Sequence, residues 1–455
     1  MQIIRTIPYQ NLFFETSNIS AGNLSPKTEG NIINIFDEIE YQSILGFGGA
    51  FTESAAYNYA QLSDDQKKDF LQKYFSRDHG IGYNFGRLHI NSCDFSIDIY
   101  SYVEKGDMDL TTFSLERDRK YIIPFLKDAL SHCKQELILF ASPWSPPAYM
   151  KDNESVVRGG ALKEEYKNLW ARYYARYIHE MEAEGICISA ISIQNEPNAI
   201  QAWESCSYSA EQERDFIEQH LAPVLDQEGL SHIKLIIWDH NKERVYDRSK
   251  KIFTSEYVRN RVWAVGHHWY SGDHFEGLQL VHEMYDKVLI SSETCCPIDL
   301  PDITVAERYG AELCGNFNHF SGAFCDWNLL LSQDGGPFHN RSEKTTAVIG
   351  KVLEDKSRGC YAPVLWDTEQ HKLTYTPAYY YIGHFSKYVE RGAVRIAITR
   401  YTEQIHACGF KNPDGQLVLI LMNTSDNIMP AVIRHNDVCT SIELAPHSIV
   451  TVLLH

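Results

Sequence analysis

The chain contains 455 residues, of which 44% are apolar and 22% are charged. These fractions are ordinary for a globular protein and exclude a disordered or fibrous chain. Sixty acidic residues against 42 basic residues give a formal net charge of −18. This charge repels a polyanion, and the sequence contains no local basic patch, so we expect no nucleic-acid partner. No apolar stretch approaches the roughly 18 residues of a membrane span, so we expect no integral membrane contact.

The start of the chain and its cysteines bear on the cellular compartment. The first ten residues hold a single base, Arg5, and no apolar run of signal-peptide length. Eleven cysteines are an odd number, and no two follow the Cys-x-x-Cys spacing of a zinc ribbon or a thioredoxin-type redox pair. These features predict a reduced, cytoplasmic protein, with a secreted protein as the alternative if a leader has been removed. The oligomeric state stays open.

Short apolar runs near the start of the chain are typical of strands. They lie at Ile3-Ile4, at Leu12-Phe13-Phe14 and over residues 32–35. These runs show no helical periodicity, so residues 1–40 are predicted to form strands that precede a larger domain.

Eight runs rich in β-branched and aromatic residues then recur within residues 41–388, beginning near Ile44, Tyr83, Leu137, Ala190, Leu235, Val262, Val288 and Ala323. Helices are predicted between several of them: over 64–75 after a Ser63 cap, over 164–184, and over 209–225, which opens with a Ser-x-x-Gln capping signature. Eight repeats of strand and helix predict an α/β fold, a closed parallel (β/α)8 TIM barrel. An open doubly wound sheet is the alternative, but the sequence lacks its Gly-x-Gly-x-x-Gly turn.

Polar and aromatic residues gather where these eight runs end. The ends are Gly48-Gly49-Ala50-Phe51, residues 87–94, Ser142-Pro143-Trp144, Gln194-Asn195-Glu196-Pro197, Asp239-His240-Asn241, His267-His268-Trp269-Tyr270, Ser292-Glu293-Thr294 and Asp326-Trp327-Asn328. The carboxyl ends of all barrel strands open at one mouth, where barrel enzymes place their active sites. The pattern therefore predicts a single active site at that mouth.

Alternating apolar residues return after about Gly383. Short strands are predicted over 394–401, 405–410, 417–422, 431–434 and 448–454, with a turn at Pro413-Asp414-Gly415. We expect residues 389–455 to pair with the strands of residues 1–40, so that both chain ends build one accessory antiparallel β-sandwich.

Two glutamates are the best candidates for catalysis. Glu196 ends the fourth run and Glu293 ends the seventh, and strands four and seven face each other across a closed barrel. Cleavage of an acetal needs a proton on the leaving oxygen and stabilisation of an oxocarbenium-like carbon, and two carboxyls supply both. The pair therefore predicts glycosidase chemistry. Pro197 favours an extended backbone at Glu196.

The neighbours of the two glutamates predict supporting roles. Arg87 and Tyr270 are expected to hydrogen-bond Glu293 and keep it ionised, because a nearby cation or donor lowers the pKa of a carboxyl. His268 is expected to position or polarise Glu196. An anionic Glu293 is expected to raise the pKa of Glu196.

Other strand ends predict contacts with a sugar. Asn195 is expected to donate a hydrogen bond to the sugar 2-hydroxyl, a contact that strengthens in the transition state. Trp144 and Trp327 are expected to stack on the ring, and Asp94 is expected to bind its outer hydroxyls.

Short motifs in a fixed order span most of the chain. They are residues 46–53, Ser92-Cys93-Asp94-Phe95-Ser96, Ala141-Ser142-Pro143-Trp144-Ser145, Asn195-Glu196-Pro197, His268-Trp269-Tyr270, Ser292-Glu293, Asp326-Trp327-Asn328, Gly335-Gly336-Pro337 and Gly383-His384-Phe385-Ser386-Lys387. In this order the chain resembles glycoside hydrolase family 30, and within it the glucosylceramidase (acid β-glucosidase) branch. The resemblance runs from about Ile44 to Tyr388 and extends more loosely into the C-terminal strands.

The resemblance implies a (β/α)8 barrel with a side β-sandwich and a retaining double-displacement mechanism. It implies that Glu196 is the acid/base and Glu293 the nucleophile, and that the sugar subsite contains Asp94, Trp144, Asn195 and Trp327. After Gly336-Pro337 the chain reads Phe338-His339-Asn340, which makes Asn340 a further sugar-binding candidate. The chain departs from the family at Ile193-Gln194, where members often have Ala-Glu, and over residues 198–206, which are shorter. These loops shape the mouth, so the aglycone stays open.

Together these observations predict a retaining, exo-acting, β-glucosidase-like enzyme that needs no metal and no organic cofactor. Its substrate would be a small β-glycoside, an oligosaccharide or a glycolipid. A β-xylosidase, a β-1,6-glucanase and a glycolipid hydrolase of sphingolipid metabolism remain alternatives. A non-catalytic carbohydrate-binding protein is an alternative of another class, although binding alone requires neither carboxyl. An inverting enzyme would place its carboxyls roughly 6.5–9.5 Å apart instead of about 5–5.5 Å.

Overall fold

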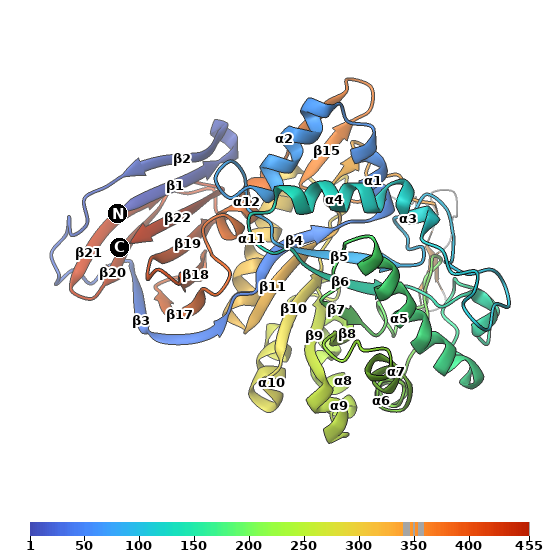
Figure 1. Cartoon of the computed structure of the whole chain (residues 1–455). Helices are drawn as coiled ribbons and strands as arrows, with labels where there is room; N and C mark the ends of the chain where they lie inside the picture. Colours follow the sequence, from blue (N-terminus) through green and yellow to red (C-terminus); the bar gives the residue numbers. More distant parts are fainter. Residues whose placement is uncertain (340–345, 349–350, 354–358, 455) are drawn as a thin grey trace.

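The computed structural model describes residues 1–339, 346–348, 351–353 and 359–454, so the sugar-binding candidate Asn340 lies outside the described residues. A closed barrel and a β-sandwich lie side by side (Figure 1). The predicted fold class, a (β/α)8 barrel with an accessory sandwich built from both chain ends, is confirmed. None of the helices in the described ranges has the combination of length and apolar character that a membrane crossing requires.

Eight parallel strands close the barrel in the order β10-β11-β4-β5-β6-β7-β8-β9. Each begins within two residues of its predicted start. Their bounds are β4 (Gly46–Ala50), β5 (Phe85–Ile90), β6 (Ile138–Pro143), β7 (Ala190–Ser192), β8 (Lys234–Asn241), β9 (Val262–His268), β10 (Val288–Glu293) and β11 (Ser321–Asp326). The two candidate glutamates therefore follow or end β7 and β10, the fourth and seventh strands of the barrel.

Helices between the strands cover the outside of the barrel (Figure 1). The α-helices are α1 (Glu53–Ala60), α2 (Asp64–Phe75), α3 (Glu116–Lys120), α4 (Ile122–His132), α5 (Lys167–Ala183), α6 (Ala210–Phe216), α7 (Ala222–Gln227), α8 (Val245–Ile252), α9 (Glu256–Arg261), α10 (Phe275–Tyr285), α11 (Asp302–Asn318) and α12 (Pro377–Ser386). Single turns of 3-10 helix are η1 (Pro8–Gln10), η2 (Ala148–Met150), η3 (Glu164–Tyr166) and η5 (Lys242–Arg244), and a π-helical turn, η4 (Ile217–Leu221), joins α6 to α7. Both predicted caps are present: Ser63 and Ser209 each accept from the backbone of a Gln three residues later, whose side chain accepts in return.

The inside of the barrel is built in layers. The apolar layer consists of Phe85, Phe140, Ala190, Ile236, Ala264, Ile290, Ala323 and Cys325. Alternate residues of a strand share one face, so the residues two positions after Phe85, Phe140 and Ile290 form a second layer inside the barrel. These residues are Arg87, Ser142 and Ser292. Gly266 lies in this second layer too, where a Cβ would approach Ser292 Oγ to 2.9 Å. Small residues therefore leave room for one long side chain, that of Arg87, across the barrel.

The two ends of the chain share one nine-stranded sheet, in the order β2-β1-β22-β19-β18-β17-β3-β20-β21. Its strands are β1 (Gln2–Ile7), β2 (Leu12–Asn18), β3 (Ile32–Ser43), β17 (Val394–Arg400), β18 (Ile405–Lys411), β19 (Leu417–Asn423), β20 (Met429–His435), β21 (Val438–Leu444) and β22 (Ser448–Leu454). Figure 1 shows the first strands beside the last, with both termini close together. Strand β21 was missed by the sequence pattern, β3 pairs with β20 in parallel, and β3 continues past the predicted boundary at residue 40.

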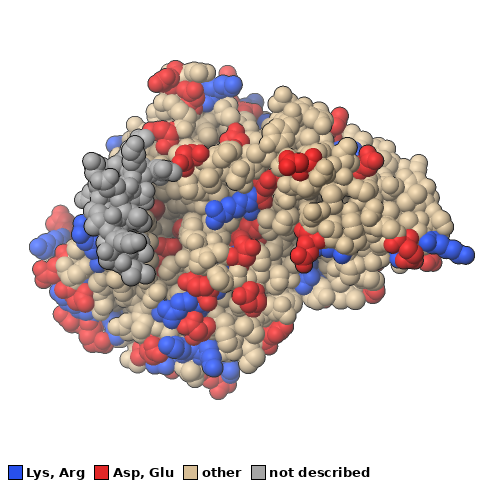
Figure 2. Space-filling view, turned by 180° about the vertical axis from the view of Figure 1, so that it is seen from behind, with Lys and Arg blue, Asp and Glu red and all other residues tan. Residues whose placement is uncertain are grey.

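Two small sheets lie between β11 and α12. One contains β12 (Leu331–Ser332), β15 (Val364–Asp367) and β16 (Lys372–Tyr375), and the other pairs β13 (Thr346–Val348) with β14 (Lys351–Leu353). On the face shown in Figure 2, the described Lys and Arg side chains lie scattered among Asp and Glu, and no broad basic patch forms.

We predict that Gly48→Ala severely destabilises the barrel. A Cβ at Gly48 would overlap the carbonyl oxygen of Phe85 on β5, the strand that carries Arg87. Overpacking of this kind against backbone should lower the free energy of unfolding by about 3 kcal/mol or more. Thermal unfolding followed by circular dichroism measures this loss. Gly30→Ala is the matched control, because a Cβ at Gly30 meets nothing within 4 Å, and its melting temperature should stay near that of the wild type. Equal melting temperatures for the two variants would contradict the prediction.

Candidate active site

A cavity of about 680 Å³ opens at the carboxyl ends of the barrel strands, within the size range of small-molecule sites. Both candidate catalytic residues, Glu196 and Glu293, line it. The other lining residues are Asp94, Trp144, Asn195, Gln201, Trp203, His240, Asn241, Tyr270, Cys295, Cys296, Pro297, Arg308, Trp327, Gly359 and Cys360. Seven of the eight predicted strand ends thus contribute a residue to this one cavity, whereas Gly48-Gly49-Ala50-Phe51 does not line it.

Arg87 lies inside the barrel and connects Glu293 and Asn195 of the cavity wall with Asp239. Its side chain is fully buried, and its Nη2 donates to Asn195 Oδ1 and to Asp239 Oδ2, both at 2.8 Å. Its Nη1 donates to Glu293 Oε2 at 2.6 Å. Burial lowers the pKa of Arg87, but the charges of Asp239 and Glu293 outweigh burial and raise it above its ordinary value. The guanidinium therefore stays charged and holds three side chains from three different strand ends.

Glu293 accepts two charge-stabilising hydrogen bonds. Besides Arg87, the Tyr270 hydroxyl donates to its Oε1 at 2.9 Å. Burial raises the pKa of Glu293 and the charge of Glu196 adds to this rise, while His268, Arg87 and the Tyr270 hydroxyl act to lower it. The predicted contacts of Arg87 and Tyr270 with Glu293 are both present, and together they fix the orientation of this carboxylate.

Asp239 enters the site through a bulge in β8. The register between β8 and β9 shifts after Trp238, and Trp238 and Asp239 both have left-handed backbone angles (φ 69° and 49°). This departure from regular alternation turns Asp239 inward toward Arg87. Its carboxylate also accepts from Ser292 Oγ at 2.6 Å. Burial raises the pKa of Asp239, but the charge of Arg87 and the hydrogen bond and charge of His268 together outweigh burial and lower it far below its ordinary value.

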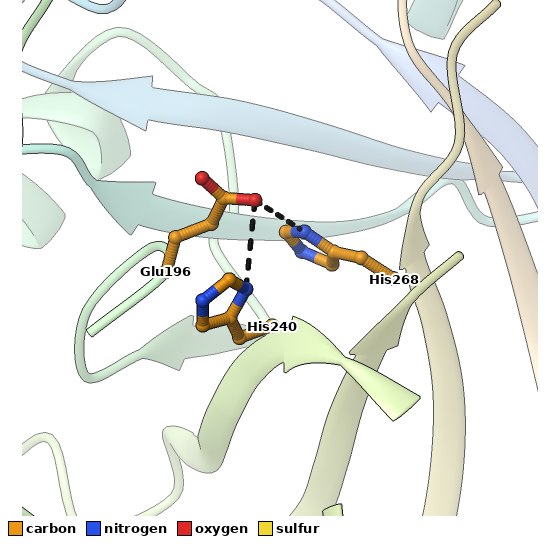
Figure 3. Close-up of side chains that lie close together, drawn as sticks. All are labelled: Glu196, His240 and His268. Atoms are coloured by element: carbon orange, nitrogen blue, oxygen red, sulfur yellow. Dashed lines mark hydrogen bonds and ion pairs between the residues drawn. The ribbon is translucent and has the colours of Figure 1, made fainter. Parts of the chain in front are cut away.

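Glu196 faces two imidazoles (Figure 3). His268 Nδ1 lies 3.3 Å and His240 Nδ1 lies 3.6 Å from Glu196 Oε1. His268 Nδ1 also lies 3.9 Å from Glu293 Oε1, so both carboxylates approach the same nitrogen from opposite strands. Pro197 was expected to keep Glu196 extended, and this was wrong: its φ is 47°, and its N–H donates to Asp239 O at 3.0 Å.

The histidines determine the charge of Glu196. Burial raises the pKa of Glu196, but His240 and His268 together outweigh burial and lower it to about 2. Like charges repel, so an anionic Glu293 acts against this lowering, as the charge of Glu196 does on Glu293. Burial lowers the pKa of His240, so His240 becomes neutral and loses this effect as the pH rises. For His268, burial acts to lower the pKa, but Glu293 and the hydrogen bond to Asp239 raise it to about 9, so His268 remains a cation.

Glu196, His240 and His268 are also the one group in the described ranges whose ligand atoms converge closely enough to hold a metal ion, all within 4.8 Å. A metal would need an unprotonated nitrogen on His268. Its Nε2 lies 3.1 Å from Asp239 Oδ1, and the raised pKa keeps a proton on Nδ1 beside Glu196. The arrangement therefore suits a proton donor to Glu196 better than a metal ligand.

The predicted sugar-binding residues divide into two groups. Asp94, Trp144, Asn195, Tyr270 and Trp327 line the cavity, whereas His268 is fully buried behind the glutamates and is not a wall residue. Trp144 and Trp327 stack on each other, with ring centroids 5.1 Å apart and planes inclined by 22°. Asp94 Oδ1 is buried and accepts no hydrogen bond from the described residues. Burial raises the pKa of Asp94, and the nearby charge of Glu293 raises it further.

Several residues of the site were not assigned roles from the sequence. Asp239 and His240 belong to one of the predicted strand ends, and this position is the one sequence feature that indicates a place in the site. Gln201 and Trp203 lie in the loop after β7, and Gln201 Nε2 donates to Glu196 Oε2 at 3.4 Å. No local pattern marks these loop residues, because only the closed barrel brings them to the cavity.

A (β/α)8 barrel with two facing carboxyls in one cavity defines a glycoside hydrolase. The chain belongs to glycosyl hydrolase family 30: the TIM-barrel domain of the family matches residues 44–389, and its beta sandwich domain matches residues 392–452. The enzymes of this family are retaining, so the protein is a retaining glycoside hydrolase, and the resemblance noted in the sequence is confirmed.

Several relatives and solved structures are similar to this chain over almost its whole length. "Putative glucosylceramidase 4" of Caenorhabditis elegans is 29% identical over 91% of this chain and 81% of that protein. "Lysosomal acid glucosylceramidase" of Mus musculus is 28% identical over 90% of this chain and 80% of that protein. The crystal structure of SrfJ from Salmonella typhimurium is 33% identical, with a TM-score of 0.93 over 100% of this chain and 99% of that one. The endo-beta1,6-glucanase BT3312 is 25% identical, with a TM-score of 0.85 over 99% and 98%.

We predict that His268→Asn moves the pH profile of kcat/KM to higher pH. The His268 cation lowers the pKa of both Glu196 and Glu293, so its removal raises both. The acidic limb, which needs an ionised carboxylate, and the basic limb, which needs a protonated one, should each shift upward by about one pH unit.

His267→Asn is the matched control for this measurement. His267 is the adjacent residue in β9, and burial lowers its pKa well below the ordinary value, so it carries no charge in this range. Its profile should keep the wild-type limbs. Unmoved limbs in His268→Asn, or limbs displaced to lower pH, would contradict the prediction.

Proposed function

We propose that the protein removes a terminal β-linked glucosyl residue by double displacement, with Glu293 as the nucleophile and Glu196 as the acid/base. The observation that carries this proposal is the asymmetry of the two carboxyls. Arg87 and Tyr270 donate to Glu293 at 2.6 and 2.9 Å, whereas the contacts of Glu196 with His268 and Gln201 are longer, at 3.3 and 3.4 Å. A firmly held carboxylate suits attack on carbon, and a loosely held one suits the gain and loss of a proton.

In the first step, Glu293 Oε attacks the anomeric carbon while Glu196 gives its proton to the departing glycosidic oxygen. The bond from the anomeric carbon to the leaving group breaks as the glycosyl ester forms. The ester removes the negative charge of Glu293. Because this charge raises the pKa of Glu196 by repulsion, its loss favours an ionised Glu196 in the intermediate.

In the second step, Glu196 accepts a proton from water, and the water oxygen attacks the anomeric carbon. The bond to Glu293 breaks, and the sugar leaves with its β configuration retained. His268 supports both steps, because its cation lies between the two carboxylates and its other nitrogen is fixed by Asp239.

The cavity wall supports the binding of a sugar ring beside the two carboxyls. Asp94 Oδ1 has no partner in the described ranges and can accept from the hydroxyls of a bound sugar. Arg87 holds Asn195 Oδ1, which leaves the Asn195 amide NH₂ for the 2-hydroxyl. The stacked Trp144 and Trp327 form one wall, and such aromatic faces suit the C–H surface of a pyranose. Relatives named as glucosylceramidases and β-1,6-glucanases act on glucosyl substrates, which favours glucose as the sugar.

Hydrolysis of a glycolipid is a second candidate. The loop after β7 brings Gln201 and Trp203 to the cavity, and Ile200, the residue before Gln201, is 69% exposed. An exposed apolar residue beside a binding cavity suits an apolar aglycone. The names of the relatives favour this substrate as well.

We expect Glu293→Gln and Glu196→Ala to fail in different ways. Glu293→Gln should reduce kcat on an aryl β-glucoside by about 10⁴-fold or more, because no glycosyl ester can form. Glu196→Ala should retain rapid release of a good leaving group such as dinitrophenol, which needs no proton, and azide should restore turnover and yield the β-glycosyl azide. Stopped-flow absorbance and NMR of the azide product measure these outcomes.

Glu276→Gln serves as the control for the two catalytic variants, because Glu276 is an exposed acid in the first turn of α10 and does not line the cavity. It should turn over at the wild-type rate. Wild-type turnover by Glu293→Gln, or an α-glycosyl azide from Glu196→Ala, would overturn the assigned roles.

A substrate panel tests the choice of sugar and aglycone. We expect kcat/KM to be highest for nitrophenyl β-glucoside among the β-glucoside, β-xyloside, β-galactoside and β-fucoside. Glucosylceramide in detergent micelles and a β-1,6-linked glucan then compare the aglycones. Ile200→Ser should lower kcat/KM on the glycolipid by about fivefold and leave the nitrophenyl glucoside unchanged, since one buried aliphatic contact contributes about 1 kcal/mol. A uniform effect on both substrates would exclude the glycolipid.

A further inference from the structure

Three cysteines contribute to the wall of the substrate cavity: Cys295, Cys296 and Cys360. Cys295 stands two residues after Glu293, in the loop that leaves β10. Cys360 lies about 65 positions later, before β15, and is only partly buried, whereas Cys295 is buried. The proposed mechanism uses none of these thiols.

Backbone pairing holds two of the cysteines together. Pro297 and Cys360 form an antiparallel bridge, in which Ile298 N–H donates to Gly359 O at 2.9 Å and Tyr361 N–H donates to Cys296 O at 2.7 Å. Cys295 precedes Pro297 by two residues. The buried Cys295 side chain belongs to one cluster with Trp144 and Trp327, and the partly buried Cys360 side chain packs against the same cluster.

The thiols also interact directly. Burial raises the pKa of the Cys295 thiol well above its ordinary value, and the adjoining Cys360 thiol raises it further. Burial and the charge of Glu293 are the main causes that raise the pKa of the Tyr270 hydroxyl. The thiols of Cys295 and Cys360 raise it to a smaller extent, so both sulfurs lie within electrostatic range of this hydroxyl. Tyr270 donates to Glu293, so a change at the thiols acts on the group that orients the nucleophile.

We propose that Cys295 and Cys360 form a reversible disulfide that lowers the activity of the enzyme. The oxidant is a low-molecular-weight disulfide such as oxidised glutathione. The Cys360 thiolate, which is the more accessible, attacks one sulfur of the oxidant and releases one thiol. The Cys295 sulfur, as its thiol proton passes to the departing thiolate, then attacks the Cys360 sulfur of the mixed disulfide and releases the second thiol. Two cysteine thiols are oxidised, one external disulfide is reduced to two thiols, and the thiol protons pass to the released thiolates.

The disulfide would tie the loop after the nucleophile to residues 359–363. A bond between residues that are diagonal neighbours across the bridge requires the two segments to shift toward each other, because the S–S bond demands close Cβ atoms. Tyr270 lines the same cavity as both cysteines and would respond to this shift. Displacement of positioning groups by a fraction of an ångström lowers rates strongly, and we expect a loss of about tenfold in kcat/KM.

Peptide mapping of the oxidised full-length chain identifies the pair without reference to activity. Trypsin releases Cys295 and Cys296 together in residues 288–308, and Cys360 in residues 359–372. After treatment with oxidised glutathione and alkylation, mass spectrometry should find these two peptides linked. The link should persist in Cys296→Ser and disappear in Cys295→Ser and in Cys360→Ser. A link that is absent from the wild type, or that survives Cys295→Ser and disappears in Cys296→Ser, overturns the proposal.

Activity measurements then test the consequence. For each protein, kcat/KM on the best aryl glycoside is compared before and after oxidation, and again after dithiothreitol. The wild type should lose about tenfold and recover fully, whereas Cys360→Ser should show no loss on oxidation. Cys187→Ser, which removes an exposed thiol outside the cavity, should behave as the wild type does. An oxidised wild type that carries the link and keeps its full activity would refute the regulatory role.

Discussion

The buried guanidinium of Arg87 is the interaction on which the site depends. A charge inside a barrel is costly to desolvate, and it is stable here because Asp239 and Glu293 pair with it in charge-assisted hydrogen bonds. Removal of Arg87 would leave two buried carboxylates without their cation, a loss of about 3–5 kcal/mol. Arg87 also fixes the amide of Asn195, so one side chain orients groups on β8, on β10 and in the segment that follows β7.

The charges around Arg87 explain how the glutamates can differ in role. Arg87 and His268 bring two positive charges to the base of the cavity, and Asp239 balances one of them. The remaining positive charge balances one of the two glutamates, so charge neutrality leaves one proton for the pair. Such a pair titrates as a unit, and its members are distinguished by the donors that each one meets. Two strong donors act on Glu293, while Glu196 meets imidazoles and the amide of Gln201.

The barrel and the loops above it contribute different properties. Residues on the strand ends, such as Arg87 and Glu293, hold the chemistry on a rigid frame that resembles solved structures over the whole chain. The outer wall comes from the loops after β7 and β10 and from the segment before β15, where Trp203, Cys295 and Cys360 lie. Loops vary more freely than strands, which suits them to select the aglycone and to carry a regulatory thiol pair.

The sequence alone predicted the architecture and the positions of the two carboxyls, because local residue patterns indicate both. Strand starts followed from β-branched runs, helix starts from Ser63 and Ser209, and the positions of Glu196 and Glu293 from the repeat of eight. Arg87 and Tyr270 could be assigned to Glu293 for the same reason.

Only the tertiary structure decided which groups meet in the cavity. The bulge that turns Asp239 inward, the left-handed backbone of Glu196, and the approach of His240 to Glu196 have no local signature. The burial of His268 depends on barrel closure. The shared cluster of Cys295 and Cys360 depends on the pairing of residues 296–298 with residues 359–361, which are distant in the sequence. Strand alternation predicts which residues face inward along regular strands, and it fails where a bulge or a loop breaks the period of two.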